Sequence, residues 1–353
     1  MKILIIQSYL AKYRADLFNE ISEKYKEVHV ITSKDKNYEY GLGSSNKFNH
    51  ILLKRINFFF FHIQIGIEKK ILFLKPDKIF IAGDFTSLSY WSTLILSKFK
   101  SIAVYVHGQG LYKKQKKNYL YKFLFLITLM FCKKYICYNK FVKKDLLRFN
   151  IKSKKINFLN NTIINHHKSL PSKTKDKNEI VFIGRLRIGS DIIFLLEVLK
   201  NLKVNHNIDL HLKIIGSGEE KNNLIKFSKL NKLNVKFYGE IYDLKKISKI
   251  CKNSKFGIYP GDAGLSVVHL MSLSIIPIIH NDFQKHNGPE PTYVNKNNGF
   301  LFKRKNFTSL TDLLIKITKM HTKELYRLSK NSYQTYLLLN KVKMSDKLIQ
   351  ILK

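Results

Sequence analysis

Short apolar runs rich in isoleucine, valine and phenylalanine recur along the whole chain, and each is followed by a longer, lysine-rich segment with helical spacing. This alternation is typical of strand–helix–strand units, in which helices join successive parallel strands. We expect strands at 2–6, 28–32, 78–82, 102–106 and 135–138 in the first half, and at 180–183, 209–215, 235–238, 255–259 and 275–279 in the second. The pattern predicts an α/β protein made of two Rossmann-like, doubly wound domains.

A polar segment separates the two series of strands. Residues 169–178, SLPSKTKDKN, contain a proline and show no apolar periodicity, which is typical of a linker. We therefore expect an N-terminal domain at 1–168 and a second domain at 179–335, a division that suits a chain of 353 residues. Residues 336–353 are predicted to form a C-terminal helix that packs back on the N-terminal domain. Ligands would bind in the cleft across which the domains face each other, beyond the carboxyl ends of the strands.

The chain carries a large excess of positive charge. Its 63 Lys and Arg residues outnumber 25 Asp and Glu, which gives a formal net charge of +38. Such a charge attracts polyanions, including nucleic acids, anionic lipid head groups and phosphorylated substrates. Biased codon usage explains the same Lys-, Asn- and Ile-rich composition, and both explanations stay open. The lysines are spread along the chain without a recognisable nucleic-acid-binding motif, so nucleic acid is the less favoured partner.

The cysteines and the N-terminus indicate a cytoplasmic protein. Three cysteines are too few for a disulfide framework, and none lies in a CxxC pair with metal-ligand histidines. The apolar run at residues 3–6 is too short for the core of a signal peptide, and no stretch approaches the ~20 apolar residues that span a bilayer. No DxD carboxylate pair is present, so we expect neither a metal nor another cofactor.

Two apolar segments are candidates for a membrane surface. Residues 56–67, INFFFFHIQIGI, are strongly aromatic and have two basic residues on either side, and a second apolar run covers 123–132. One hypothesis is an interfacial patch that docks on anionic lipid at the inner face of the cytoplasmic membrane. The alternative is a buried strand and a buried helix.

In the second half, four predicted strands end in small residues. The ends contain Gly184, Gly216, Gly239 and the segment 260–264, PGDAG. Since the carboxyl ends of parallel strands meet at one edge, small residues there are typical of a nucleotide crevice. Arg185 directly follows one strand end, where a guanidinium can bind a phosphate. Tight turns without a ligand and a surface arginine are the alternatives.

Several of these segments resemble the retaining GT-B glycosyltransferases of family 4, the glycosyl transferases group 1, in particular bacterial enzymes of lipopolysaccharide, O-antigen or capsule synthesis. The resemblance covers nearly the whole chain and is strongest in the second half. It is carried by FIGRL at 182–186, IIGSGEE at 214–220, GLSVVHLMS at 264–272 and the dipeptide PE at 289–290, in the order and spacing of the family.

The resemblance implies roles in binding the donor. Arg185 would contact its diphosphate and act in catalysis, and Gly264, Leu265 and Ser266 would hold the distal phosphate through their backbone. The helix that contains His269 would face the ribose. Gly216 and Gly239 complete the implied donor-binding set.

The chain departs from the family at two places. Where the family usually has Glu-x7-Glu, this sequence has Gly261 and His269, and where a lysine often follows the GRL arginine it has Ser190. Asp262 is the candidate to replace the first missing carboxylate. The implied catalytic residues are therefore Arg185, Asp262 and, in the first half of the chain, His107.

In the first half, the resemblance rests on QSYLAKYRADLF at 7–18 and VHGQGLYKK at 106–114. His107 follows a strand and would face the donor sugar across the cleft, or would be a structural histidine at a strand turn. Tyr13 and Arg14 are assigned to the acceptor side, where Arg14 would meet a phosphate of the donor or acceptor, or pair with Glu20 or another surface carboxylate.

The resemblance therefore predicts a hexosyltransferase-type enzyme (EC 2.4). It would move a sugar, with retention, from a UDP- or GDP-sugar to a hydroxyl of a lipid-linked oligosaccharide or polysaccharide acceptor. Because the Glu pair is missing, a GT-B-like sugar-nucleotide epimerase or an inactive homologue is the alternative, and a basic nucleic-acid-binding protein is a further one.

Overall fold

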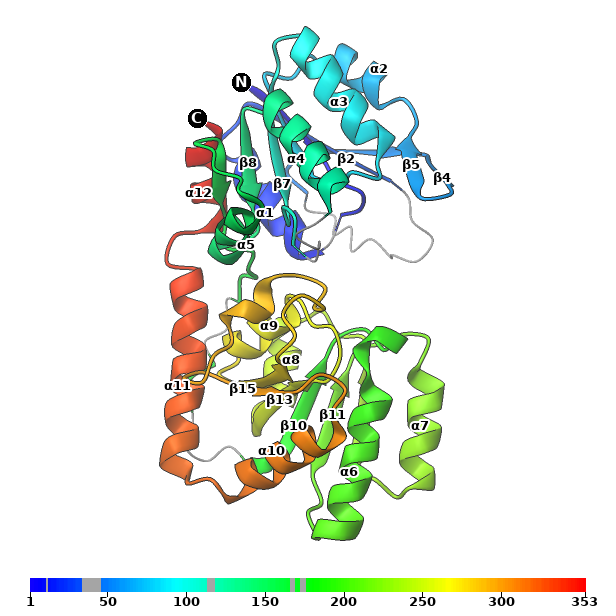
Figure 1. Ribbon diagram of the computed structural model, residues 1–353, viewed down its shortest axis with the longest axis vertical. Helices are drawn as coiled ribbons and strands as arrows, with labels where there is room; N and C mark the ends of the chain where they lie inside the picture. Colours follow the sequence, from blue (N-terminus) through cyan, green and yellow to red (C-terminus); the bar gives the residue numbers. More distant parts are fainter. Residues whose placement is uncertain (11, 34–45, 113–117, 166–168, 172–175) are drawn as a thin grey trace. The chain divides into compact units, whose positions relative to one another are not determined.

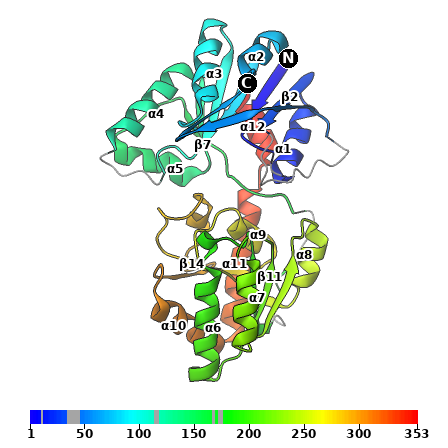
Figure 2. The same cartoon turned by 90° about the vertical axis from the view of Figure 1, so that its right-hand side faces the viewer.

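The computed structural model describes residues 1–10, 12–33, 46–112, 118–165, 169–171 and 176–353. The chain forms two compact units, which we call unit 1 (Met1–Asn161 and Val342–Lys353) and unit 2 (Thr162–Lys341). Each unit contains a parallel sheet with helices on both faces, as Figure 1 and Figure 2 show. The predicted α/β class with two Rossmann-like domains is confirmed.

The sheet of unit 1 has seven parallel strands in the order β3-β2-β1-β6-β7-β8-β9. A two-stranded antiparallel hairpin, β4–β5, follows β3 in the chain. The strands are β1 (Lys2–Ile6), β2 (Glu27–Ser33), β3 (Asn49–Leu53), β4 (Arg55–Phe58), β5 (Phe61–Gln64), β6 (Lys78–Ala82), β7 (Ala103–Gly108), β8 (Lys134–Cys137) and β9 (Ile156–Phe158). The helices are α1 (Lys12–Ser22), α2 (Ile67–Leu74), α3 (Leu88–Phe99), α4 (Tyr119–Phe131), α5 (Lys140–Asp145), the 3-10 helix η1 (Leu146–Phe149) and α12 (Met344–Leu352).

The isoleucine-rich strands of unit 1 are buried on both faces. In β1, Leu4 and Ile6 pack with residues of α2, α3 and α4, whereas Ile3 and Ile5 pack with residues of α1 and α12. Alternate side chains of a strand point to opposite faces, so one apolar run supplies two layers of core. All five strands predicted in this half form, and the pattern does not predict β3, β4, β5 and β9.

The last helix belongs to unit 1, although the chain reaches it from unit 2. Leu348 and Leu352 of α12 are fully buried in the core beside α1. The hydroxyl of Tyr105 in β7 donates a hydrogen bond of 2.8 Å to the Leu352 carbonyl. Of the segment 336–353, residues up to 341 lie in unit 2 and those from 342 onward in unit 1.

The sheet of unit 2 has six parallel strands in the order β12-β11-β10-β13-β14-β15. The five strands predicted in this half all form, and β15 is additional. The strands are β10 (Asp176–Ile183), β11 (His211–Ile215), β12 (Val235–Gly239), β13 (Ser254–Tyr259), β14 (Ile276–His280) and β15 (Phe300–Phe302). The helices are α6 (Ile192–His206), α7 (Lys221–Leu230), α8 (Leu244–Ile250), α9 (Ser266–Ser272), α10 (Phe307–Lys319), α11 (Thr322–Leu339) and the 3-10 helices η2 (Ile188–Ser190) and η3 (Glu290–Tyr293).

The two units divide between residues 161 and 162, ahead of the segment 169–178 that the sequence indicates as a linker. Residues after this division are fastened to unit 2. The backbone N–H of Asn165 donates to the Tyr336 hydroxyl at 2.9 Å, and the Ser169 hydroxyl donates to the Leu273 carbonyl at 3.0 Å. Among the described residues, no helix is long and apolar enough to cross a membrane.

Candidate active site

The strand order of unit 2 places β10 and β13 side by side at the centre of the sheet, with later strands on both sides. In open α/β sheets, ligands bind beyond the carboxyl ends of the strands at such a point. Here β10 leads into Gly184 and Arg185, and β13 leads into the segment 260–264. The candidate site is therefore the set of loops at this edge.

These loops are joined to one another by backbone hydrogen bonds. The N–H of Gly184 donates to the Ile215 carbonyl at 3.0 Å, and the N–H of Gly216 donates to the Gly239 carbonyl at 2.7 Å. The N–H of Leu186 bonds to the Ser217 carbonyl at 3.0 Å. The ends of β10, β11 and β12 thus form one continuous backbone platform.

The glycines of the platform are required by close approach of the backbone. A Cβ atom on Gly216 would lie 1.8 Å from the Gly184 carbonyl oxygen, and one on Gly218 would lie 2.3 Å from the Leu186 carbonyl oxygen. Gly239 has no atom within 4 Å of its would-be Cβ, but its φ of +74° favours glycine. Gly216 and Gly239 therefore shape the edge of the sheet, whatever the ligand.

The loop after β13 lies against the η2 turn. The N–H groups of Gly261 and Asp262 donate to the carbonyls of Ser190 and Gly189, at 3.1 and 2.9 Å. A Cβ on Gly261 would lie 2.3 Å from the Gly189 carbonyl oxygen. A carboxylate side chain at position 261, which the family usually has, would require this turn to move.

Gly264 differs from these glycines because the space beside it is open. The nearest atom to its would-be Cβ is the Oε2 atom of Glu290, at 3.9 Å. Leu265 and Ser266 follow at the start of α9 and are partly exposed. The three residues implied by the resemblance to hold the distal phosphate are thus accessible at the edge of unit 2.

Arg185 is exposed at the end of β10, whereas Ser190 is fully buried. The Ser190 hydroxyl donates a hydrogen bond of 2.5 Å to the Arg185 carbonyl and so holds the backbone of the arginine loop. The side chain at position 190 consequently points into the protein. Arg187, two residues after Arg185, is also exposed.

Asp262 is the centre of a polar cluster that sequence patterns do not reveal. Its Oδ1 atom lies 3.2 Å from a guanidinium nitrogen of Arg304 and 3.3 Å from Nε2 of His280. His286 accepts a hydrogen bond from the Ala263 N–H at its Nδ1 and donates from Nε2 to the His280 carbonyl, so the tautomer of this ring is defined. The two imidazoles stack with centroids 3.7 Å apart. The cluster fixes the loop that leads into α9.

His269 lies on α9, and its Nε2 atom is buried without a hydrogen-bond partner. Burial lowers the pKa of its imidazole from 6.5 to about 4. The ring is therefore neutral at physiological pH. It can accept or donate one hydrogen bond, as a contact with a ribose hydroxyl requires.

His107 lies inside unit 1, with only 3% of its surface exposed. Its ring stacks between those of Phe80 and Tyr138, at centroid distances of 5.4 and 4.6 Å. Burial, with a smaller contribution from the Arg14 charge, holds its pKa well below 6.5. The ring of His107 is therefore enclosed by the core of unit 1. This location fits a structural histidine better than a residue on an exposed wall of the site.

Arg14 is also buried, and it joins three parts of unit 1. Its guanidinium donates to Oδ1 of Asn161 at 2.7 Å and lies 3.6 Å from the Met344 sulfur. Glu20, the carboxylate named as an expected partner of Arg14, lies 3.6 Å from the Lys343 ammonium. Tyr13 lies in α1, but its side chain falls outside the described residues.

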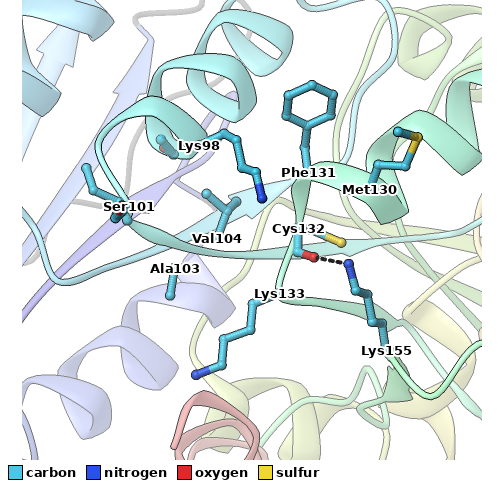
Figure 3. A pocket seen from close by; sticks show the side chains of 11 residues that line it. Lys98, Ser101, Ala103, Val104, Met130, Phe131, Cys132, Lys133 and Lys155 are labelled. Carbon is cyan, nitrogen blue, oxygen red and sulfur yellow. Dashed lines mark hydrogen bonds between the residues drawn. The ribbon is translucent and has the colours of Figure 1, made fainter.

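Unit 1 also has a shallow pocket, which lies at the amino ends of its strands and so at the edge opposite to their carboxyl ends. Figure 3 shows it at the amino ends of β7 and β8, where Lys98, Lys133 and Lys155 contribute to its lining. The Lys155 ammonium donates to the carbonyls of Leu129 and Cys132 at 2.6 and 3.1 Å. Ligands of parallel sheets bind at the other edge, so the pocket is no candidate for the donor. Within the described part of the chain, no group of three or more His, Cys, Asp or Glu side chains could hold a metal ion.

Residues 164–335 match the family model of the Glycosyl transferases group 1. No curated protein matches the chain in sequence.

Solved structures share the fold over the full length of the chain. Anabaena Alr3699/HepE in complex with UDP and glucose is 12% identical, with a TM-score of 0.69 and coverage of 100% of this chain and 99% of that one. A glycosyltransferase from Rickettsia africae ESF-5 is 17% identical, with a TM-score of 0.67 and coverage of 100% and 98%. The lipopolysaccharide outer core galactosyltransferase WaaB, in its apo form, is 13% identical, with a TM-score of 0.68 and coverage of 100% and 99%. The fold is therefore that of the GT-B glycosyltransferases.

Proposed function

We propose that this chain, whose residues 164–335 match the family model of the Glycosyl transferases group 1, is a glycosyltransferase that moves a sugar from a UDP- or GDP-sugar to a hydroxyl of a lipid-linked oligosaccharide. Transfer would retain the anomeric configuration and serve the synthesis of a cell-surface polysaccharide such as lipopolysaccharide, O-antigen or capsule. The observation that carries the proposal is the coincidence of the family match with the unit that has Arg185 exposed at a platform of strand ends.

The donor would bind at the loops after β10 and β13. Structures of the similar HepE protein contain UDP or UDP-glucose, which supports a uridine donor for this chain as well. In our proposal the diphosphate lies against the backbone at Gly264, Leu265 and Ser266, beside the open space at Gly264. The neutral His269 imidazole would hydrogen-bond the ribose.

Arg185 would carry the largest part of catalysis. As the bond between the sugar and the diphosphate breaks, negative charge accumulates on the leaving group, and a pre-positioned guanidinium stabilises that charge more than it stabilises the bound substrate. Protein cations would do this without a metal ion. Asp262, held by Arg304, would orient the loop that contacts the donor, and the buried, neutral His107 would act neither as an acid nor as a base.

The acceptor would be held at a membrane, with the enzyme attached to its inner face as a peripheral protein. Similarity to the galactosyltransferase WaaB of the lipopolysaccharide outer core supports an acceptor of this class. The exposed aromatic residues of the β4–β5 hairpin and the exposed Lys54 just before it support the attachment.

The proposal is tested with the purified protein and a panel of UDP-, GDP- and CDP-sugars. A true donor should raise the melting temperature, because it binds only the folded state. Arg185→Ala should then lower kcat/KM for that donor by roughly 100- to 1000-fold. Its melting temperature should fall by less than about 2 °C, because the side chain is exposed. Arg327→Ala, which removes an exposed arginine from α11, is the matched control and should retain activity. Near-normal turnover of Arg185→Ala would show that the phosphate assignment is wrong.

An epimerase is the second candidate, favoured by the absence of the usual carboxylates at Gly261 and His269. Product analysis with UDP-GlcNAc alone separates the two functions, since only an epimerase converts a free donor. Retention is tested separately, by the anomeric configuration of the transfer product.

A further inference from the structure

The β4–β5 hairpin ends in four consecutive phenylalanines, Phe58–Phe61, which we call the phenylalanine tip (Figure 1). The side chains of Phe59 and Phe60 are 100% and 87% exposed, and those of Phe58 and Phe61 are 40% and 45% exposed. The rings of Phe59 and Phe60 therefore contribute little or nothing to the core, whereas those of Phe58 and Phe61 contact each other with centroids 6.4 Å apart. A contiguous exposed group of such rings is typical of an interaction site.

The backbone at the tip is unfavourable for the residue that occupies it. Phe59 has a φ of +50° in the two-residue turn between Phe58 and Phe61, which pair across the hairpin. Turns of this kind strongly prefer glycine, asparagine or aspartate at positive φ, and a bulky residue there is strained. A strained residue whose side chain is fully exposed is better explained by a function of that side chain than by folding.

The flanks of the tip are positively charged. Between residues 49 and 75 the chain has five Lys and Arg residues and one carboxylate, Glu68. Lys54 and Lys69 are exposed, and Glu68 accepts a hydrogen bond from Ser92. Exposed apolar rings on a segment of net positive charge match the chemistry of an anionic lipid surface, where rings enter the interface and cations meet the head groups.

The base of the hairpin is fastened to the carboxyl-end edge of the unit 1 sheet, the edge at which parallel sheets generally bind ligands. The side-chain amide of Gln64 donates to the Ser33 hydroxyl at 2.9 Å, at the end of β2. The N–H of His62 donates to the Thr86 carbonyl at 3.1 Å, and its ring lies 3.6 Å from Asp84, just after β6. A rigid base of this kind sets the distance between the tip and the carboxyl ends of the unit 1 strands.

We propose that the phenylalanine tip inserts into the interface of an anionic bilayer and holds the strand ends of unit 1 near the membrane surface. A lipid-linked acceptor would present its hydroxyl at that surface, and in this respect the inference rests on the proposed function. The second apolar segment, α4, buries Phe125 and Leu129 in the core and exposes Phe123 and Met130. The proposal does not depend on this helix.

The test is co-sedimentation of the full chain with vesicles of phosphatidylcholine alone and with 30% phosphatidylglycerol, in the absence of donor and acceptor. The wild type should bind the anionic vesicles. The double variant Phe59→Ser/Phe60→Ser should bind about 100-fold more weakly, since each ring that enters an apolar environment contributes a factor of about ten. Val204→Ser/Leu230→Ser, which changes two exposed apolar residues of unit 2, is the matched control and should bind like the wild type.

A single variant separates a membrane role from a structural one. Phe59→Asn places a residue that tolerates positive φ in the turn, so it should keep or raise the melting temperature while it weakens vesicle binding. A lower melting temperature would assign Phe59 a role in folding and overturn the inference. Unchanged binding of the double variant would overturn it too.

Self-association is the other outcome that would contradict the proposal. If the tip joined two copies, the wild type would sediment as a dimer without lipid, the double variant would be a monomer, and vesicle binding would not depend on Phe59 and Phe60. Because the readout contains no sugar, the result is independent of the donor assignment. Conversely, the double variant should keep the thermal shift with the donor that stabilises the wild type.

Discussion

Replacing Gly216 by alanine should destabilise unit 2 strongly, and the structure gives the size of the effect. The new Cβ would lie 1.8 Å from the Gly184 carbonyl oxygen, whereas real Cβ contacts stay beyond 3.0 Å. One strand end must therefore move by roughly 1.2 Å, the difference between these distances. That movement would disturb the hydrogen bonds that Gly184 and Gly216 donate to neighbouring strand ends.

Three costs combine in this variant. Overpacking typically costs about 1–3 kcal/mol, a disturbed backbone hydrogen bond about 1 kcal/mol, and a side chain at a φ of +145° about 1–2 kcal/mol. We expect a total loss of about 3–6 kcal/mol. For a unit of about 180 residues, each kcal/mol lowers the melting temperature by about 2–4 °C, so the midpoint should fall by about 10 °C.

Two further glycines separate the contributions. Gly239→Ala meets no atom within 4 Å but has a φ of +74°, so only backbone strain remains and the midpoint should fall by about 3 °C. Gly264→Ala has neither close contact nor positive φ and should change the midpoint by less than about 2 °C. Scanning calorimetry of the full chain measures all three. If Gly216→Ala melts like the wild type, or if Gly264→Ala falls as far, the argument from backbone contact is refuted.

Two more predictions concern His269 and Ser190, positions at which this sequence differs from the residues usual in the enzymes that it resembles. The His269 imidazole titrates at about 4 when folded and near 6.5 when unfolded, so the unfolded chain binds more protons between these values and the free energy of unfolding decreases as the pH falls from 6.5 to 4. In His269→Gln this decrease in the free energy of unfolding, on the order of 2–3 kcal/mol, should be absent. Melting curves recorded between pH 4 and 6.5 measure it, and the same pH dependence in both proteins would contradict the prediction. Ser190→Lys restores the usual lysine at a fully buried position and breaks the bond to the Arg185 carbonyl, so it should lower the melting temperature by about 6 °C or more without improving turnover. Tighter donor binding at unchanged stability would instead indicate that a lysine at this position reaches the phosphate.

Strand positions could be predicted from sequence because a strand buried on both faces, such as Ile3–Ile6, is a continuous apolar run. Such a run is visible in the sequence without knowledge of the neighbouring strands. The hairpin could not be predicted. Four phenylalanines in a row show no alternation, and the turn at Phe59 and Phe60 lacks the usual glycine or asparagine. Helical periodicity indicates a helix at the C-terminal end but does not say where residues 336 to 353 pass from one unit to the other.

At the candidate site, the residues that could be predicted from sequence are those that the strand order places at one edge of the sheet. Arg185 and Gly264 follow strands of one parallel sheet, so their common location follows from the order of elements. The partner of Asp262 could not be found in this way, because Arg304 is 42 residues distant and lies after β15. The burial of Ser190 and of His107 depends on three-dimensional packing, which spacing alone does not encode.

The assignment of α12 to unit 1 has a consequence for biosynthesis. Residues 342–353 are translated after the whole of unit 2, so the ribosome must complete a second domain before the first can close its own core. Until then, Phe18 and Ile21 of α1 lack the neighbours that α12 supplies. A nascent chain of this protein would therefore carry an incompletely folded N-terminal half that chaperones can bind. Trimming or tagging the chain near residue 352 would destabilise unit 1, most of which lies at the other end of the sequence.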